Sequence, residues 1–109
     1  MGTARDISAD LDWLVERIRE GYEPEKIILF GSLARGETHE DSDIDLIIVK
    51  DTDASYGERV KALLPVLRGW AGGADIVVYS LKEYENARSL GGAFLNSAEK
   101  DGVVLYERR

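Results

Sequence analysis

The feature of this sequence that most restricts its fold is a pair of aspartates, Asp43 and Asp45, at the start of an apolar run. The run continues through Leu46–Val49 and predicts a largely buried β-strand. Alternate side chains of a strand point to one face, so both carboxylates are expected on the same side, about 7 Å apart. Two such carboxylates are costly beside an apolar run unless a positive group lies between them. A divalent cation such as Mg²⁺, which binds carboxylate and phosphate oxygens together, is the candidate.

A Gly-Ser corner precedes this pair along the chain. The apolar run Ile27–Phe30 ends at Gly31 and Ser32, and ten residues then separate the corner from Asp43. Backbone N–H groups and a hydroxyl at such a corner are suited to hold phosphates. The segment Ser32–Gly36 is expected to form a short helical turn whose N-terminus faces those phosphates. Together, the corner and the aspartates predict a site for a metal and a phosphate group.

The sequence does not match the residue spacing of other known phosphate-binding or metal-binding motifs. Asp41–Asp45 has the start of an EF-hand loop, but Leu46 and Thr52 stand where that loop needs Gly and Glu. The chain has no Gly-Lys-Ser/Thr of a P-loop, and Gly31–Gly36 lacks the dinucleotide-binding glycine spacing. A purely structural interpretation, with a tight turn followed by a strand, leaves the placement of both carboxylates on one face unexplained.

These residues resemble the pattern of the nucleotidyltransferases of the DNA polymerase β superfamily, most closely its minimal single-domain branch, the MNT proteins. That pattern is a Gly-Ser, a spacer of about this length, and Asp-hydrophobic-Asp-hydrophobic, which here is Asp43–Leu46. The branch often adds Arg-Gly after the corner and a serine before the first aspartate, which Arg35, Gly36 and Ser42 match. The resemblance extends over nearly the whole chain and is weak outside the motif.

A third carboxylate is expected on the later strand Ala74–Tyr79. Alternation places Asp75, Val77 and Tyr79 on one face of that strand. The polymerase β fold carries a carboxylate on the strand after the intervening helix, and the resemblance assigns this place to Asp75. The alternative is that Asp75 only ends the preceding Gly-rich turn.

The resemblance implies nucleotidyl transfer with two Mg²⁺ ions. Asp43 and Asp45 would bind one ion together with the nucleotide phosphates, and the same pair with Asp75 would bind a second ion that activates an acceptor hydroxyl. Asp75 would be a metal ligand, a general base or both. Gly31 and Ser32 would hold the β- and γ-phosphates while pyrophosphate leaves.

Three polar residues near the motif keep two interpretations each. Arg35 either neutralises phosphate charge or is a surface arginine one turn past the site. Ser42 either binds near the nucleotide and orients Asp43 or is an ordinary turn serine. His39, the single histidine, is either an exposed loop residue or a proton shuttle.

The composition restricts the domain organisation, the class of binding partner and the cellular location that we expect. At 109 residues, the chain is expected to be one domain, residues 1–109. Its net charge of −7 argues against direct binding of nucleic acid, which normally needs clustered Lys and Arg. The absence of cysteines and of any long apolar run predicts a soluble, cytoplasmic protein without membrane contact.

The fold class expected is α/β (α+β), with a mixed sheet of about four strands and helices mainly on one face. Periodicity predicts a helix around Ile7–Ile18 and another from Ser55 with a kink or break near Pro65. A Ser-x-x-Glu capping box at Ser80 predicts a third helix. A further helix is expected over Leu90–Lys100 and a short closing strand after it.

Three functions remain possible for this chain, and they differ in what it modifies or binds. Minimal nucleotidyltransferases are commonly paired with a helical HEPN ribonuclease toxin, so the resemblance implies an antitoxin that transfers AMP from ATP to a tyrosine of that toxin. The second possibility is transfer to a small hydroxyl compound such as an aminoglycoside, although such enzymes usually carry an additional domain. The third is a binding module that neutralises a partner without catalysis. The residues do not fix the nucleotide base or the homo- or hetero-oligomeric state.

Overall fold

The computed structural model describes residues 7–31, 34, 36, 44–70 and 72–108. Within these residues one mixed sheet has the strand order β3-β2-β1-β4. The strands are β1 (Lys26–Phe30), β2 (Ile44–Lys50), β3 (Ala74–Ser80) and β4 (Val103–Glu107). β1 is antiparallel to both β2 and β4, whereas β2 and β3 are parallel. The expected fold class, with a small mixed sheet, is confirmed.

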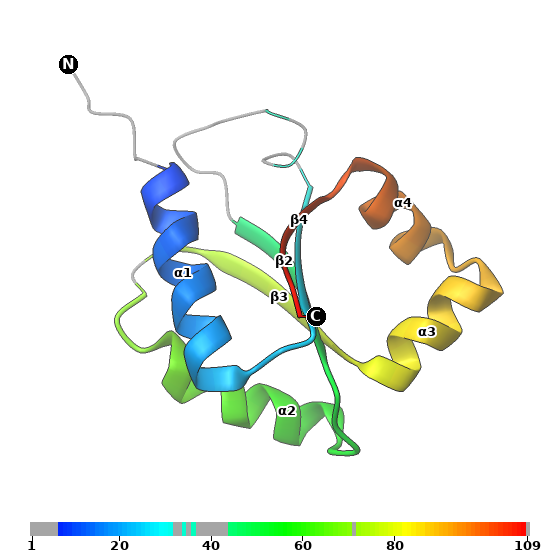
Figure 1. The fold of residues 1–109 in the computed structure, drawn as a ribbon, viewed down its shortest axis with the longest axis horizontal. Helices are drawn as coiled ribbons and strands as arrows, with labels where there is room; N and C mark the ends of the chain where they lie inside the picture. The colour runs from blue at the N-terminus through cyan, green and yellow to red at the C-terminus, as the bar shows by residue number, and fades with distance from the viewer. Residues whose placement is uncertain (1–6, 32–33, 35, 37–43, 71, 109) are drawn as a thin grey trace.

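The helices flank the sheet on both sides, as Figure 1 shows. They are α1 (Ile7–Tyr22), α2 (Tyr56–Leu63), α3 (Leu81–Leu90) and α4 (Ala93–Asp101), and α2 continues into the short 3-10 helix η1 (Leu64–Leu67). None of the helices in the described part of the chain has the length and apolarity needed to cross a membrane.

One face of the sheet packs against α1 and α2. The core there joins Leu14 and Ile18 of α1 and Leu63 of α2 to strand residues that are almost fully buried. Those strand residues are Ile27, Leu29, Ile44, Leu46, Ile48 and Val78. Burial of this apolar surface is the main force that holds the two helices on the sheet.

The opposite face is covered only in part. Tyr84 of α3 and Leu95 and Ala98 of α4 pack on Ile47 and Val49 of β2. The sheet therefore carries helices on both faces and not mainly on one, which corrects the expectation from sequence. The physical reason is that β1 and β2 are apolar on both faces over most of their length, and each apolar face needs a cover.

Capping side chains, a proline and a glycine determine where the helices begin and end. The Ser55 side chain caps α2, and Ser80 and Glu83 form the capping box of α3. Pro65 lies in η1, so the predicted break near this proline is confirmed. Gly91, in the left-handed conformation, ends α3, and the expected helix over Leu90–Lys100 begins only at Ala93.

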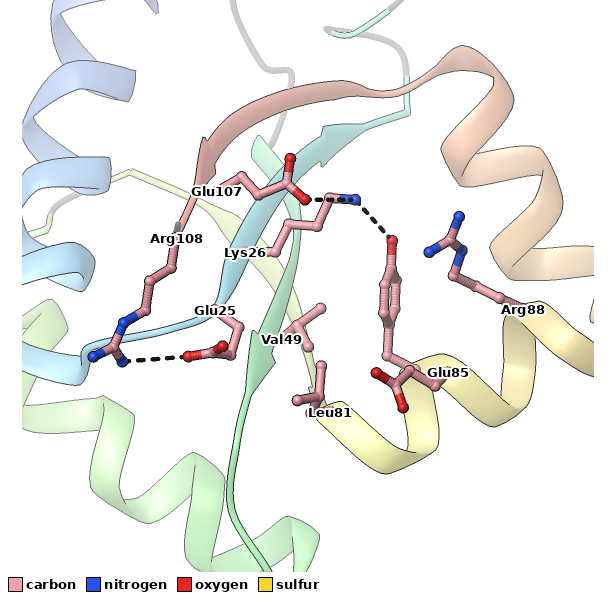
Figure 2. Close-up of a pocket in the computed structure, with 9 residues that line it drawn as sticks. Glu25, Lys26, Val49, Leu81, Glu85, Arg88, Glu107 and Arg108 are labelled. Atoms are coloured by element: carbon pink, nitrogen blue, oxygen red, sulfur yellow. Dashed lines mark hydrogen bonds and ion pairs between the residues drawn. The ribbon is translucent and has the colours of Figure 1, made fainter.

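A polar cluster surrounds Tyr84 where α3 meets the sheet, beside the pocket drawn in Figure 2. Tyr84 is 4% exposed, donates a hydrogen bond of 2.9 Å to Glu99 and accepts one of 3.2 Å from Lys26. Burial and then the hydrogen bond to the Glu99 carboxylate raise the pKa of Tyr84 to about 12. The folded protein therefore holds the phenol neutral at pH values where the unfolded chain ionises it.

We expect this tyrosine to make stability fall in strong base. The contribution is fully present below the ordinary tyrosine pKa of 10.0 and is lost as the pH rises to about 12, because the unfolded state loses its proton first. The expected loss is on the order of 2 kcal/mol. The free energy of unfolding in urea is measured at several pH values for the native protein and for Tyr84→Phe. The difference between the two pH profiles gives the contribution of Tyr84, since the other groups titrate in both proteins. Parallel pH profiles for the two proteins would contradict this assignment.

Candidate active site

Two of the predicted carboxylates lie in one transverse row of the sheet. Asp45 of β2 is directly opposite Asp75 of β3 in the parallel pairing, and opposite Phe30 of β1 in the antiparallel pairing. Paired residues on neighbouring strands point to the same face, about 4.8 Å apart between strands. Asp45 is half-buried and Asp75 is exposed. The row Phe30–Asp45–Asp75 therefore places two carboxylates and an aromatic ring on one face, at one end of the sheet.

Helices α3 and α4 cover this row at its β1 end, where Phe30 packs against the cluster that they form with Ile47 and Val49. At the other end of the row, Asp75 is exposed. The pocket of Figure 2 lies at the other end of the sheet, beside Lys26 and Val49, which pair with each other across β1 and β2. The carboxylate row and that pocket are therefore separate features.

Gly31 brings the backbone against the Asp45 carboxylate. It follows β1 directly and has φ +78°, a conformation that favours glycine. A Cβ at this position would overlap with Oδ2 of Asp45 and would lie 3.2 Å from its Cγ. Only glycine lets the chain turn here at this distance from the carboxylate. The corner expected from the sequence is therefore adjacent to an aspartate from a different strand.

The remaining predicted site residues, Ser32, Arg35, Ser42 and Asp43, lie outside the described residues, as does His39. Among the residues that the structure describes, no group of three or more acidic or histidine side chains could hold a metal ion. Asp45 and Asp75 alone supply two carboxylates, and the third expected ligand is Asp43. The structure therefore brings together Gly31, Asp45 and Asp75 from three strands or their ends.

These residues fit a Mg²⁺ and phosphate site. Carboxylate oxygens are the ligands that Mg²⁺ prefers, usually alongside phosphate oxygens. The Asp45 carboxylate occupies the space that a Cβ of residue 31 would need, so the Gly31 backbone and this carboxylate lie side by side. Gly31 adds no side chain of its own between its backbone and a phosphate group.

One residue at this end of the sheet has a place that the sequence did not indicate. Phe94 is 49% exposed, whereas its neighbours Leu95 and Ala98 in α4 are buried. Its ring makes an edge-to-face contact with Phe30, at 5.5 Å between centroids. The Gly-Gly pair just before it moves the start of α4 and is the only signal for this placement that we find in the sequence.

Sequence comparison relates this chain to a family of proteins. The family profile described as a nucleotidyltransferase domain matches residues 11–88, which include Gly31, Asp45 and Asp75. A protein of Methanocaldococcus jannaschii, provisionally named a protein adenylyltransferase, is 36% identical over 83 residues. The matched region covers 74% of this chain and 77% of that protein.

Solved structures share the fold. A crystal structure of a Sulfolobus solfataricus protein, provisionally named a nucleotidyltransferase, has a TM-score of 0.62 and 23% identity, and the match covers 99% of this chain and 91% of that one. A variant of the toxin–antitoxin pair MntA-HpeT matches with a TM-score of 0.62, 19% identity and coverage of 91% and 73%. A toxin–antitoxin structure with AMP-PNP matches with a TM-score of 0.58, 17% identity and coverage of 90% and 73%.

Proposed function

Since this chain belongs to the nucleotidyltransferase domain family and is a nucleotidyltransferase, we propose that it transfers AMP from ATP to a tyrosine hydroxyl of a partner protein. The partner in this proposal is a HEPN-type ribonuclease toxin, which the modification inactivates in the cytoplasm. Residues 1–109 act as a single catalytic domain, and the partner presents its own acceptor.

The observation that carries the proposal is the register of the carboxylate row. Asp45 and Asp75 face each other across parallel strands, and Gly31 contacts Asp45. Nucleotidyl transfer needs anionic ligands at the α-phosphate and a phosphate-binding backbone beside them. Two carboxylates in one row, with the Gly31 backbone next to that row, support this proposal.

Each residue then has a defined task. Asp43, Asp45 and Asp75 would hold two Mg²⁺ ions, which when bound neutralise phosphate charge and lower the pKa of the acceptor hydroxyl. Asp75, the exposed member of the row, accepts the proton of that hydroxyl as general base. The hydroxyl oxygen forms a bond to the α-phosphorus while the bond from that phosphorus to the bridging oxygen breaks, and pyrophosphate leaves. Gly31 and Ser32 bind the β- and γ-phosphates, Arg35 neutralises phosphate charge, and Ser42 orients Asp43.

The choice of a protein acceptor is supported by the relatives and by charge. The Methanocaldococcus jannaschii relative carries the provisional name of a protein adenylyltransferase, and structures of similar fold come from toxin–antitoxin pairs. A net charge of −7 favours a basic protein over nucleic acid as partner. A ribonuclease that binds RNA is such a basic protein.

The test is transfer of a nucleotide label. The purified chain is incubated with Mg²⁺, α-³²P-labelled ATP and the protein encoded by the neighbouring gene, and a parallel reaction uses γ-³²P-labelled ATP. We expect label on the partner from the α-labelled nucleotide only, because the β- and γ-phosphates leave as pyrophosphate. Mass spectrometry then locates AMP on a tyrosine of the partner.

Other distributions of label would overturn parts of this proposal. Label from γ-³²P-labelled ATP would indicate phosphoryl transfer. Label on an aminoglycoside or another small hydroxyl compound, but not on the protein, would identify a small-molecule acceptor. Inhibition of the toxin without any label would identify a non-catalytic binding module.

A further inference from the structure

An aromatic pair borders the carboxylate row on the β1 side. Phe30 lies in the row itself, opposite Asp45, and Phe94 reaches it from the first turn of α4. The two rings meet edge to face, with centroids 5.5 Å apart and planes at 88°. Phe94 thus forms an apolar wall at the edge of the row, on the side away from Asp75.

Phe94 is less buried than the other apolar residues by which α4 contacts the sheet. Leu95 and Ala98 are 1% and 6% exposed, whereas Phe94 contacts the sheet at Phe30. Phe94 keeps about half of its surface open to solvent, at 49%. A large aromatic side chain that is half exposed beside a candidate active site is suited to bind a flat ligand.

The order of the strands along the row indicates that Phe94 borders the nucleotide and that Asp75 borders the acceptor. Phe30 is followed directly by Gly31, the phosphate-binding corner of the proposed mechanism, whereas Asp75 is on the far side of Asp45. The acceptor hydroxyl must approach the α-phosphorus opposite the leaving pyrophosphate, and Asp75 is placed for that approach. The β1 side therefore remains for the nucleotide.

We propose that Phe94, supported from behind by Phe30, is the stacking surface for the purine base of the nucleoside triphosphate. This inference rests on the proposed function and names the contact that gives the base its affinity. Stacking on an aromatic face needs no hydrogen bonds to the base edge, and a purine offers a large ring surface for it. Phe94 is on this view a binding residue for the base.

The test compares ATP with inorganic tripolyphosphate, which has the phosphates but no base. Calorimetric titration with Mg²⁺ present gives the dissociation constant of each ligand. For Phe94→Ala and Phe94→Leu we expect the constant for ATP to rise about tenfold, because the π face is lost. We expect the constant for tripolyphosphate to stay unchanged, and Phe94→Trp to bind ATP as the native chain does.

Leu90→Ala is the matched control, because Leu90 is also apolar and is 85% exposed at the end of α3. It should bind both ligands like the native chain. Unchanged ATP affinity in Phe94→Ala together with weaker labelling of the partner would overturn the inference, since the ring would then contact the acceptor protein. Equal weakening for ATP and tripolyphosphate would also overturn it. A native chain that binds neither ligand would instead remove the proposed function itself.

Discussion

Asp45→Asn is expected to lower the rate of nucleotide transfer by about a thousandfold, the upper end of what loss of one transition-state-stabilising group costs. The amide keeps the volume of the side chain but removes a negative charge that the reaction needs beside the phosphates. Asp45 is in contact with Gly31 and in register with Asp75, so its charge is central to the site. Single-turnover labelling of the partner with α-³²P-labelled ATP measures this loss.

Asp51→Asn is the matched control for charge, because Asp51 is an exposed aspartate just after β2. It should transfer label at the native rate. The thermal midpoint of Asp45→Asn should stay within a few degrees of the native value, since the substitution creates no cavity. Transfer at the native rate by folded Asp45→Asn would exclude the carboxylate row as the active site.

Arg59→Ala is expected to reduce the free energy of unfolding by about 3 kcal/mol, the upper end of what it costs to leave a buried hydrogen-bond acceptor without its donor. Arg59 is 5% exposed, although it lies in a short amphipathic helix. It donates hydrogen bonds to the carbonyls of Ala54 and Val78, at 3.0 and 2.8 Å, and two to Glu83, at 2.7 and 3.0 Å. Its removal leaves the Val78 carbonyl, which is shielded from water, without its donor, whereas the Glu83 carboxylate is about half exposed.

Urea unfolding followed by circular dichroism measures this difference. Arg108→Ala is the control, because Arg108 also pairs with a glutamate, Glu25, but its side chain is 56% exposed. Exposed ion pairs contribute at most about 1 kcal/mol, so this variant should be close to the native protein. Arg59→Ala with the stability of Arg108→Ala would mean that the hydrogen bonds of Arg59 are replaced by water.

The sequence predicted most of the elements because local signals agreed. The apolar strands β1, β2 and β3 are found within a residue or two of their expected ends. Ser80 and Glu83 cap α3 by a pattern visible in four residues. Of the candidate site, the sequence singled out Gly31, Asp45 and Asp75, which the structure brings together, while their roles stay predictions.

Long-range packing accounts for what the sequence did not predict. In the segment from Ser55 to Leu67, the apolar residues Tyr56 and Leu64 are 48% and 61% exposed, whereas the charged Arg59 is buried. The 3-10 turn at Pro65 changes the residue period from 3.6 to about 3, which turns Leu64 away from the core. Arg59 is buried because its partners, Val78 and Glu83, come from the next strand and helix. Strand order and the contact between Phe30 and Phe94 depend in the same way on distant residues.

The parallel pairing of β2 and β3 has a consequence for how activity arises during folding. Parallel neighbours cannot be joined by a tight hairpin, so the chain leaves β2, passes through α2 and η1, and returns to begin β3. Closing that long connection is slow compared with local helix formation. Asp45 and Asp75 meet only once it has closed, and Arg59 ties the returning strand to the connecting helix. Any function that needs both carboxylates therefore depends on this crossover being docked on the sheet.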